Sequence, residues 1–148
     1  MDEKLFSDDY FMRIALKEAV QAFEKDEVPV GAVITANNTI VARAHNLTET
    51  LNDVTAHAEM QVITAAASSI GSKYLNDCTM YITLEPCTMC AGAIFWAQLG
   101  KLVYGAPDPK RGYTLLSDPV IHPRTKILSG VLADESEKLL KKFFKKRR

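Results

Sequence analysis

The apolar side chains of this sequence alternate between the spacing of helices and that of strands, and this alternation most limits its fold. The first segment, residues 8–25, carries apolar side chains at helical spacing: Met12, Leu16, Ala19 and Phe23. Two segments rich in β-branched residues, 28–36 and 39–46, then flank Asn37-Asn38, a pattern that predicts a β-hairpin. The chain therefore opens with one helix followed by two strands.

The rest of the chain continues this alternation. The expected elements are a helix at 57–69, a strand at 79–86, a helix at 87–100, a strand at 101–106, an irregular loop at 107–123, a short fifth strand within 125–132 and a helix from Ala133 onward. The apolar side of this closing helix is expected to carry Leu139, Leu140, Phe143 and Phe144. Helices interleaved with strands in this way imply a sheet that is covered on both faces.

The composition is that of an ordinary globular protein, with 47% hydrophobic and 24% charged residues among 148. This length fits one domain, residues 1–148, and no repeat or low-complexity linker divides it. The chain starts without a secretory signal, and no apolar run is long enough to span a bilayer, so we expect a cytoplasmic protein without membrane association. The three cysteines would stay reduced there, as metal ligands or core residues.

The formal net charge is zero, so binding to nucleic acid would need a local basic patch. One candidate is the C-terminal end of the chain, where basic residues follow Glu137 closely. They are Lys138, Lys141, Lys142, Lys145, Lys146, Arg147 and Arg148. Such a run is either a contact for nucleic acid or simply the solvated face of a terminal helix.

Two short motifs place metal-binding side chains at the start of two predicted helices. His57 and Glu59 open one helix, and Cys87 and Cys90 open another directly after Pro86. Because Cys87 and Cys90 are three residues apart, their sulfur atoms lie on one face of a helical turn and can bind the same ion. The helix N-terminus also favours the thiolates that a metal needs. With His57, they make the three-ligand set of a catalytic zinc site, whose fourth position holds water.

Glu59 lies two residues beyond His57, which suits a carboxylate beside the bound water rather than on the metal, and predicts the catalytic acid and base. Two other interpretations of C-x-x-C remain. A redox pair does not need the H-x-E turn upstream. A structural zinc site needs a fourth protein ligand, which would be Cys78, His45 or His122. Cys78, at the start of a strand, fits a small buried hydrophobic residue instead.

H-x-E followed by P-C-x-x-C is the signature of zinc deaminases that act on cytosine or adenine. Over its whole length, the chain resembles the bacterial tRNA-specific adenosine deaminases, the TadA family of the cytidine deaminase superfamily. The stretches that carry the resemblance are VPVGAV, Asn46, TAHAEM, EPCTMCAGAI, VYGAPDPKRG and GVLADESEKLLKKFFKKRR. The core motif is shared by cytidine, guanine and adenosine deaminases of this fold, whereas the flanking stretches discriminate between substrates.

The resemblance implies a fold and an activity. The fold would be a three-layer α/β/α cytidine-deaminase-like fold with a central mixed sheet of about five strands. The activity would be hydrolytic deamination of adenosine to inosine at the wobble position of a tRNA anticodon. The family also implies one Zn²⁺ per subunit and a homodimer that completes the pocket.

The resemblance also assigns residues to the substrate. Asn46 would hydrogen-bond the nucleoside through an amide that suits a purine edge; the alternative is a turn residue after a strand. Asp108 and Lys110 match positions beside the anticodon loop. Backbone carbonyls near Leu84 and Glu85 are expected to hold the leaving group. The residues that match RNA-backbone contacts, which would weaken steeply with salt, are Lys145, Lys146, Arg147 and Arg148.

Phe95-Trp96 departs from the family pattern, because many tRNA deaminases carry a polar pair after AGAI. A similar aromatic pair occurs in guanine deaminases. Deamination of guanine, or of another free nucleobase or nucleoside, is therefore the alternative function. An aromatic pair of this kind is also typical of a core or dimer contact. A zinc-binding module without catalytic activity is the third hypothesis.

Overall fold

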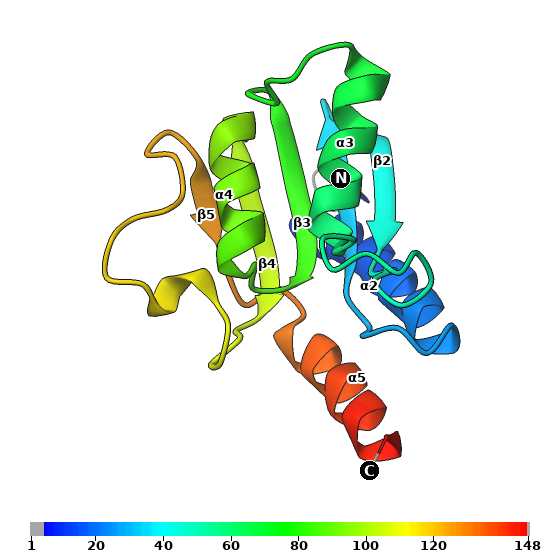
Figure 1. Cartoon of the computed structure of the whole chain (residues 1–148). Helices are drawn as coiled ribbons and strands as arrows, with labels where there is room; N and C mark the ends of the chain where they lie inside the picture. Colours follow the sequence, from blue (N-terminus) through cyan, green and yellow to red (C-terminus); the bar gives the residue numbers. More distant parts are fainter. Residues whose placement is uncertain (1–4, 148) are drawn as a thin grey trace.

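The computed structural model describes residues 5–147, which include a five-stranded sheet. Its strands are β1 (Gly31–Ala36), β2 (Thr39–His45), β3 (Cys78–Leu84), β4 (Lys101–Ala106) and β5 (Lys126–Leu128). Their order across the sheet is β2-β1-β3-β4-β5 (Figure 1). β1 runs antiparallel to β2 and β3, whereas β3, β4 and β5 run parallel to one another. The sheet is mixed, as the family resemblance predicts.

Helices cover both faces of this sheet (Figure 1). They are α2 (Asp8–Glu24), α3 (Ala58–Ile70), α4 (Thr88–Ala97) and α5 (Ala133–Lys146). α3 and α4 lie on one face and contact each other, while α2 and α5 contact each other and strands β3 and β4 on the opposite face. The three-layer α/β/α arrangement is thus confirmed. Within residues 5–147, no helix is both long enough and apolar enough to cross a membrane.

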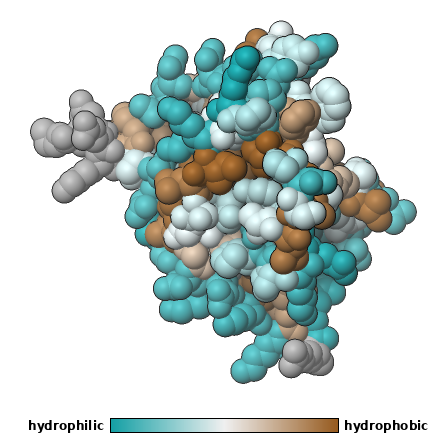
Figure 2. Space-filling model, turned by 90° about the vertical axis from the view of Figure 1, so that its left-hand side faces the viewer, coloured by the Kyte–Doolittle hydropathy of each residue, from teal (hydrophilic) through white to brown (hydrophobic). Residues whose placement is uncertain are grey.

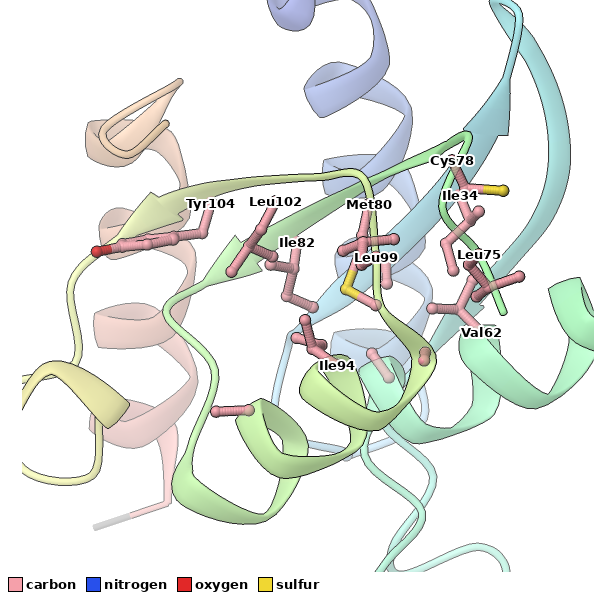
Figure 3. Packing of buried hydrophobic residues seen from close by; sticks show 14 of the residues in the cluster. Ile34, Val62, Leu75, Cys78, Met80, Ile82, Ile94, Leu99, Leu102 and Tyr104 are labelled. Carbon is pink, nitrogen blue, oxygen red and sulfur yellow. The ribbon is translucent and has the colours of Figure 1, made fainter. Parts of the chain in front are cut away.

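Alternate side chains of β3 pack into different layers. Met80 and Ile82 pack with Val62 of α3 and Ile94 of α4 in the larger core cluster (Figure 3). Tyr81, between them in sequence, belongs to a second cluster formed with α2. This period-two alternation is what a strand between two helical layers requires. Burial of each large apolar side chain stabilises the fold by roughly 1.5–3 kcal/mol.

The hairpin has the expected turn but begins later than the sequence indicates. Asn37 and Asn38 have φ angles of 51° and 61°, the left-handed conformation that a two-residue hairpin turn requires. β1 starts at Gly31 rather than at Val28. Gly31 lies so close to α2 that a Cβ atom would be 2.1 Å from the carbonyl oxygen of Ala15. The three residues before Gly31 are irregular, and two of them line the cavity described below.

The end of α4 differs from the sequence prediction. The helix stops at Ala97, and Gln98 adopts the left-handed conformation with φ 52°. Gly100, the expected helix end, instead packs against the chain before β3, where a Cβ atom would be 2.2 Å from the carbonyl oxygen of Asn76. The glycine therefore serves a close backbone approach rather than the end of a helix.

The closing helix α5 buries less of its apolar side than expected. Phe143 is 2% exposed and packs against Phe23 of α2 at a centroid distance of 6.0 Å. Phe144, which was also expected on the apolar side, is 51% exposed and is not part of the packed surface. Neighbouring residues on a helix point about 100° apart, and α5 contacts the rest of the protein along one side only.

The carboxyl end of β3 and the first turns of α3 and α4 meet at one end of the sheet, the lower end in Figure 1. His57 directly precedes α3, and Cys87 directly precedes α4. The fold therefore brings together the two motifs that are 30 residues apart in the sequence.

Candidate metal centre and active site

His57, Cys87 and Cys90 form a compact group whose ligand atoms all lie within 4.8 Å of one another. The Nδ1 atom of His57 lies 3.7 Å from the Sγ atom of Cys87 and 3.5 Å from that of Cys90. Tetrahedral zinc, with bonds of roughly 2.3 Å to sulfur and roughly 2.0 Å to nitrogen, would separate the sulfur and nitrogen atoms by about 3.6 Å. The three side chains therefore fit a tetrahedral metal ion of the size of zinc.

Two of these side chains occupy N-cap positions. His57 precedes α3 and Cys87 precedes α4, both with extended backbone conformations. An N-cap side chain ordinarily accepts a hydrogen bond from the first helical turn, but neither residue does so here. Their side chains approach each other instead, near the partial positive charge of two helix N-termini. That charge favours thiolate over thiol in this group.

Proton sharing within the group shifts the pKa of all three side chains. A hydrogen bond from the Cys90 thiol, together with His57, lowers the pKa of Cys87 to about 4 despite its partial burial. The hydrogen bond to Cys87, followed by burial, raises the pKa of Cys90. The pKa of His57 is also raised, chiefly by its bond with Cys87. A cation bound by all three would replace the shared proton, which is how metal ligation is coupled to proton release.

Glu59 lies in the first turn of α3 and is 4% exposed. Burial raises the pKa of this carboxyl group to about 7. A group that titrates near neutral pH can both accept a proton and return it, which is what general acid and base catalysis requires. Glu59 faces the same cavity as His57 and Cys87.

A cavity of about 410 Å³ opens at this group, within the usual size range of small-molecule sites. Asn46, Leu84, Glu85 and Asp108, which the sequence places at the substrate, all line it. Its other lining residues are Val28, Val30, Thr48, His57, Ala58, Glu59, Cys87 and Arg111. Lys110, the remaining expected substrate contact, is not among the lining residues.

Five of these lining residues were not expected from the sequence: Val28, Val30, Thr48, Ala58 and Arg111. The first two belong to VPVGAV, one of the stretches that carry the family resemblance, and this was the available signal. Arg111 reaches the cavity because the Oδ1 atom of Asp108 accepts hydrogen bonds from the backbone N–H groups of Lys110 and Arg111, at 3.1 and 3.0 Å. This tight turn brings Arg111 to the cavity instead of Lys110.

Asn46 comes directly after β2 and is 7% exposed. Its backbone N–H donates to the carbonyl of Val30 at 3.1 Å, so two lining residues are tied together. The side-chain amide of Gln61 in α3 donates to the carbonyls of His45 and Ala56, at 2.7 and 3.1 Å. These bonds fasten both ends of the segment between β2 and α3 to the body of the protein.

None of the residues considered as a fourth metal ligand joins the metal-binding group. His45 bonds the Oε1 atom of Glu18 at 2.8 Å and the ammonium group of Lys25 at 3.0 Å. The ring of His122 lies 5.5 Å from that of Phe95. Cys78 is 4% exposed and packs in the larger core cluster, as expected for a small hydrophobic residue. Among residues 5–147, the metal-binding group thus consists of one histidine and two cysteines.

Neither member of the aromatic pair Phe95-Trp96 lines the cavity. Phe95 is half-buried and packs edge to face against Trp96, with centroids 5.4 Å apart. Trp96 is 77% exposed, the second-largest exposed fraction among the large hydrophobic side chains of residues 5–147. Within one chain, therefore, the pair gives no direct contact to a bound base.

The basic tail lies beside the end of α2. The ammonium group of Lys146 stands 5.4 Å from the ring centroid of Phe23, and the guanidinium of Arg147 donates to the carbonyl of Asp26. Asp26 is two residues before Val28, which lines the cavity. Lys145 is exposed, and Arg148 lies outside the described residues.

Comparison with known proteins relates this site to known deaminases. The family described as MafB19-like deaminase matches residues 6–148. A tRNA-specific adenosine deaminase of Agrobacterium fabrum is 45% identical over 144 residues, which cover 94% of this chain and 95% of that protein.

Solved structures give the same result. A structure from a study of A-to-I editing by tRNA:A34 deaminases at the wobble position of transfer RNA has a TM-score of 0.83 at 46% identity, covering 88% of this chain and 99% of the other. This likeness confirms the cytidine-deaminase-like fold. A guanine deaminase from Bacillus subtilis has a TM-score of 0.63 at 38% identity, covering 66% of this chain and 62% of the other. With full-length relatives at such identity, the chain belongs to the family of tRNA-specific adenosine deaminases.

Proposed function

We propose that this protein converts adenosine to inosine at the wobble position of a tRNA anticodon by hydrolytic deamination. The observation that carries the proposal is the cavity in which one histidine and two cysteines meet beside a buried glutamate. The family membership of nearly the whole chain supports the RNA substrate. Residues 1–148 act as one deaminase domain, and a tRNA substrate fits a cytoplasmic enzyme.

His57, Cys87 and Cys90 hold one zinc ion per subunit in this proposal. Their donor set leaves the fourth position of a tetrahedral site without a protein ligand among residues 5–147. A zinc ion held by these residues would lower the pKa of a water molecule toward about 7 and so make a nucleophile available at neutral pH.

Glu59 moves the protons. Its carboxylate takes a proton from the water whose oxygen attacks C6 of adenine, and delivers this proton to N1. The hydroxyl group on C6 then gives its proton, through Glu59, to the amino nitrogen. The C6–N bond breaks, ammonia leaves, and C6 keeps a carbonyl oxygen with N1 protonated, which is inosine. Glu59 ends the cycle as a carboxylate.

The other lining residues bind the base. Asn46 offers an amide donor and acceptor to the purine edge, and Val28 and Val30 provide apolar walls. Backbone carbonyls near Leu84 and Glu85 accept hydrogen bonds from the departing amino group. The base must leave its stack to reach C6, which costs roughly a few kcal/mol and least in an unpaired loop.

The substrate proposal predicts activity on RNA and none on small molecules. The pure zinc-loaded protein should be incubated separately with unmodified tRNA, an anticodon stem-loop, guanine, cytidine and adenosine, and the products identified by mass spectrometry. We expect inosine in both RNA substrates and no turnover of the three small molecules. Turnover of guanine alone would refute the proposal.

Guanine deamination is the second candidate because of Phe95-Trp96 and the likeness to a guanine deaminase. The exposure of Trp96 and its absence from the cavity weaken this candidate within one chain. An exposed tryptophan instead supports a contact between subunits.

We infer that the protein forms a homodimer. The side of the molecule that carries β5 and the loop before it shows an apolar band (Figure 2). Its edge strand β5 exposes Ile127 and Leu128, and the preceding loop exposes Leu115 and Leu116, all at 40% or more. Exposed apolar surface of this kind marks an interaction site, and a second copy of the chain would cover it.

The basic tail is proposed to contact the RNA backbone through Lys145, Lys146, Arg147 and Arg148. Replacing Lys145 and Lys146 with Ala should weaken binding of the anticodon stem-loop and flatten the slope of log K against log salt concentration by about 1.4, since each phosphate contact to single-stranded RNA contributes about 0.7. Fluorescence anisotropy at several salt concentrations measures this. Lys73→Ala, beside Tyr74 and far from the cavity, is the control. An unchanged slope in the double variant would contradict the contact.

A further inference from the structure

Two buried carboxylates beside the cavity have no role in the deamination chemistry described above: that of Glu85, which lines the cavity, and that of Glu27, which directly precedes the lining residue Val28. Glu27 is 0% exposed and Glu85 is 3% exposed. Among residues 5–147, neither forms a salt bridge. A buried carboxylate without a positive partner is costly unless hydrogen bonds compensate for its lost hydration. The donors that supply these bonds come from the two segments that line the cavity.

Glu27 binds the segment between β2 and α3. Its Oε1 atom accepts the backbone N–H of Glu49 at 3.2 Å, and its Oε2 atom accepts both the N–H and the hydroxyl of Thr50, each at 2.6 Å. Burial acts to raise the pKa of Glu27, but the bonds from Thr50 and Glu49 bring it below its ordinary value. The carboxylate is therefore ionised and holds the segment that carries Asn46 and Thr48.

Glu85 binds the segment after β4 in the same way. Its Oε1 atom accepts the backbone N–H of Asp108 at 3.1 Å. Its Oε2 atom accepts the N–H of Thr114 at 3.0 Å and the hydroxyl of Thr114 at 2.7 Å. The bonds fall at both ends of the segment 108–114, which carries Arg111 into the cavity.

The segment held by Glu85 is also fixed against the metal-binding end of β3. The N–H of Tyr113 donates to the carbonyl of Pro86 at 3.0 Å, and Gly112 pairs with Cys87 in an isolated β-bridge. A Cβ atom at Gly112 would lie 2.1 Å from the Oε2 atom of Glu85, so the fit leaves no room for a side chain. These contacts fix the position of the segment 108–114 relative to the metal ligand Cys87.

We propose that Glu27 and Glu85 are positioning residues, each of which holds one wall of the substrate cavity in the conformation that binds the RNA. This inference rests on the proposed function. In both residues the two carboxyl oxygen atoms accept three hydrogen bonds from donors of one segment. If such a segment adopts the binding conformation only part of the time, the apparent affinity of the protein for RNA falls in proportion to that fraction.

The test removes one of the three hydrogen-bond donors to Glu27 and one of the three to Glu85. Thr114→Val and Thr50→Val keep the shape of the side chain and delete the hydroxyl bond to the carboxylate. We expect KM for the anticodon stem-loop to rise about tenfold in each variant, with kcat changed by less than about twofold. Thr114→Ser and Thr50→Ser keep the hydroxyl group and should restore the wild-type KM.

A matched control separates positioning from general stability. The hydroxyl of Thr125 donates to the carbonyl of Leu99 at 2.6 Å, in a buried contact away from the cavity. Thr125→Val should lower Tm and leave KM unchanged. The proposal is overturned if the Val variants at 50 and 114 keep the wild-type KM, or if Thr125→Val raises KM as much as they do.

Amide hydrogen exchange tests the same inference without activity. The N–H groups of residues 49, 50, 108 and 114 should exchange faster in the corresponding Val variants, and in Glu27→Gln and Glu85→Gln, than in the wild type or in Thr125→Val. Unchanged exchange in all of these variants would overturn the proposal. If the wild-type protein deaminates no RNA, the proposed function fails, while the exchange measurement still decides whether the two carboxylates hold these segments.

Discussion

Glu59→Gln should reduce the rate of RNA deamination by about a thousandfold while the protein keeps its zinc, because positioned proton transfer contributes roughly 10²–10⁴-fold to such reactions. The amide has nearly the shape of the carboxyl group, but it can neither take the proton of the attacking water nor deliver it to N1. Glu59→Ala should lose activity for the same reason. Inosine formation in the stem-loop, followed by mass spectrometry, gives the rate, and metal analysis of the same sample gives the zinc content.

Glu18→Gln is the matched control for this variant. Glu18 is also buried, at 7% exposed, but its carboxylate bonds His45 and does not line the cavity. We expect this variant to lose stability and to keep its turnover rate at temperatures where it is folded. Activity retained by Glu59→Gln would remove Glu59 from the mechanism, and loss of zinc in that variant would assign it to the metal site instead.

Cys87→Ala should lose both the metal and the activity, since it removes one of three protein ligands. The wild-type protein is expected to contain about one zinc ion per chain. The variant should contain far less after dialysis against a mild chelator, because two ligands cannot retain the ion against competition. Binding of zinc to the folded state also stabilises it, so Tm of the variant should no longer respond to added zinc. Metal analysis and thermal unfolding measure these effects.

Cys78→Ala provides the comparison within the same protein. Cys78 is buried in the core and lies outside the metal-binding group. Its loss should lower the free energy of unfolding by about 1 kcal/mol, through lost packing, and leave the zinc content unchanged. A Cys87→Ala protein with full zinc content and turnover would refute the ligand assignment, as would a Cys78→Ala protein that loses the metal.

Features that depend on local pattern were accessible from the sequence. The strand at 101–106 has the predicted bounds, because its β-branched and aromatic residues are flanked by Gly and Pro. His57, Cys87 and Cys90 were predicted to meet because each motif opens a helix, and the structure brings them within ligand distance. The spacing of two cysteines on one turn depends only on helix geometry, so it needs no knowledge of the rest of the fold.

Features that depend on long-range contacts were not accessible. Gly100 has the sequence signature of a helix end, yet its position is determined by the carbonyl of Asn76. Lys110 and Arg111 are neighbouring basic residues that the sequence alone does not distinguish. Only the turn around Asp108 decides which of them reaches the cavity. The side chain of Glu85 gave no signal at all, since its donors lie 23 and 29 residues further along the chain.

The attachment of each cavity wall to a single buried glutamate has a consequence for engineering. A designer who transplants the segment 108–114 from a relative with another specificity would expect the new loop to bring that specificity along. In this protein, the graft can keep its shape only if it supplies a hydroxyl and two backbone donors where Asp108 and Thr114 now supply them to Glu85. The exchangeable module is therefore the loop together with Glu85, its anchor directly after β3, and chimeras that split the two should fold but bind RNA poorly.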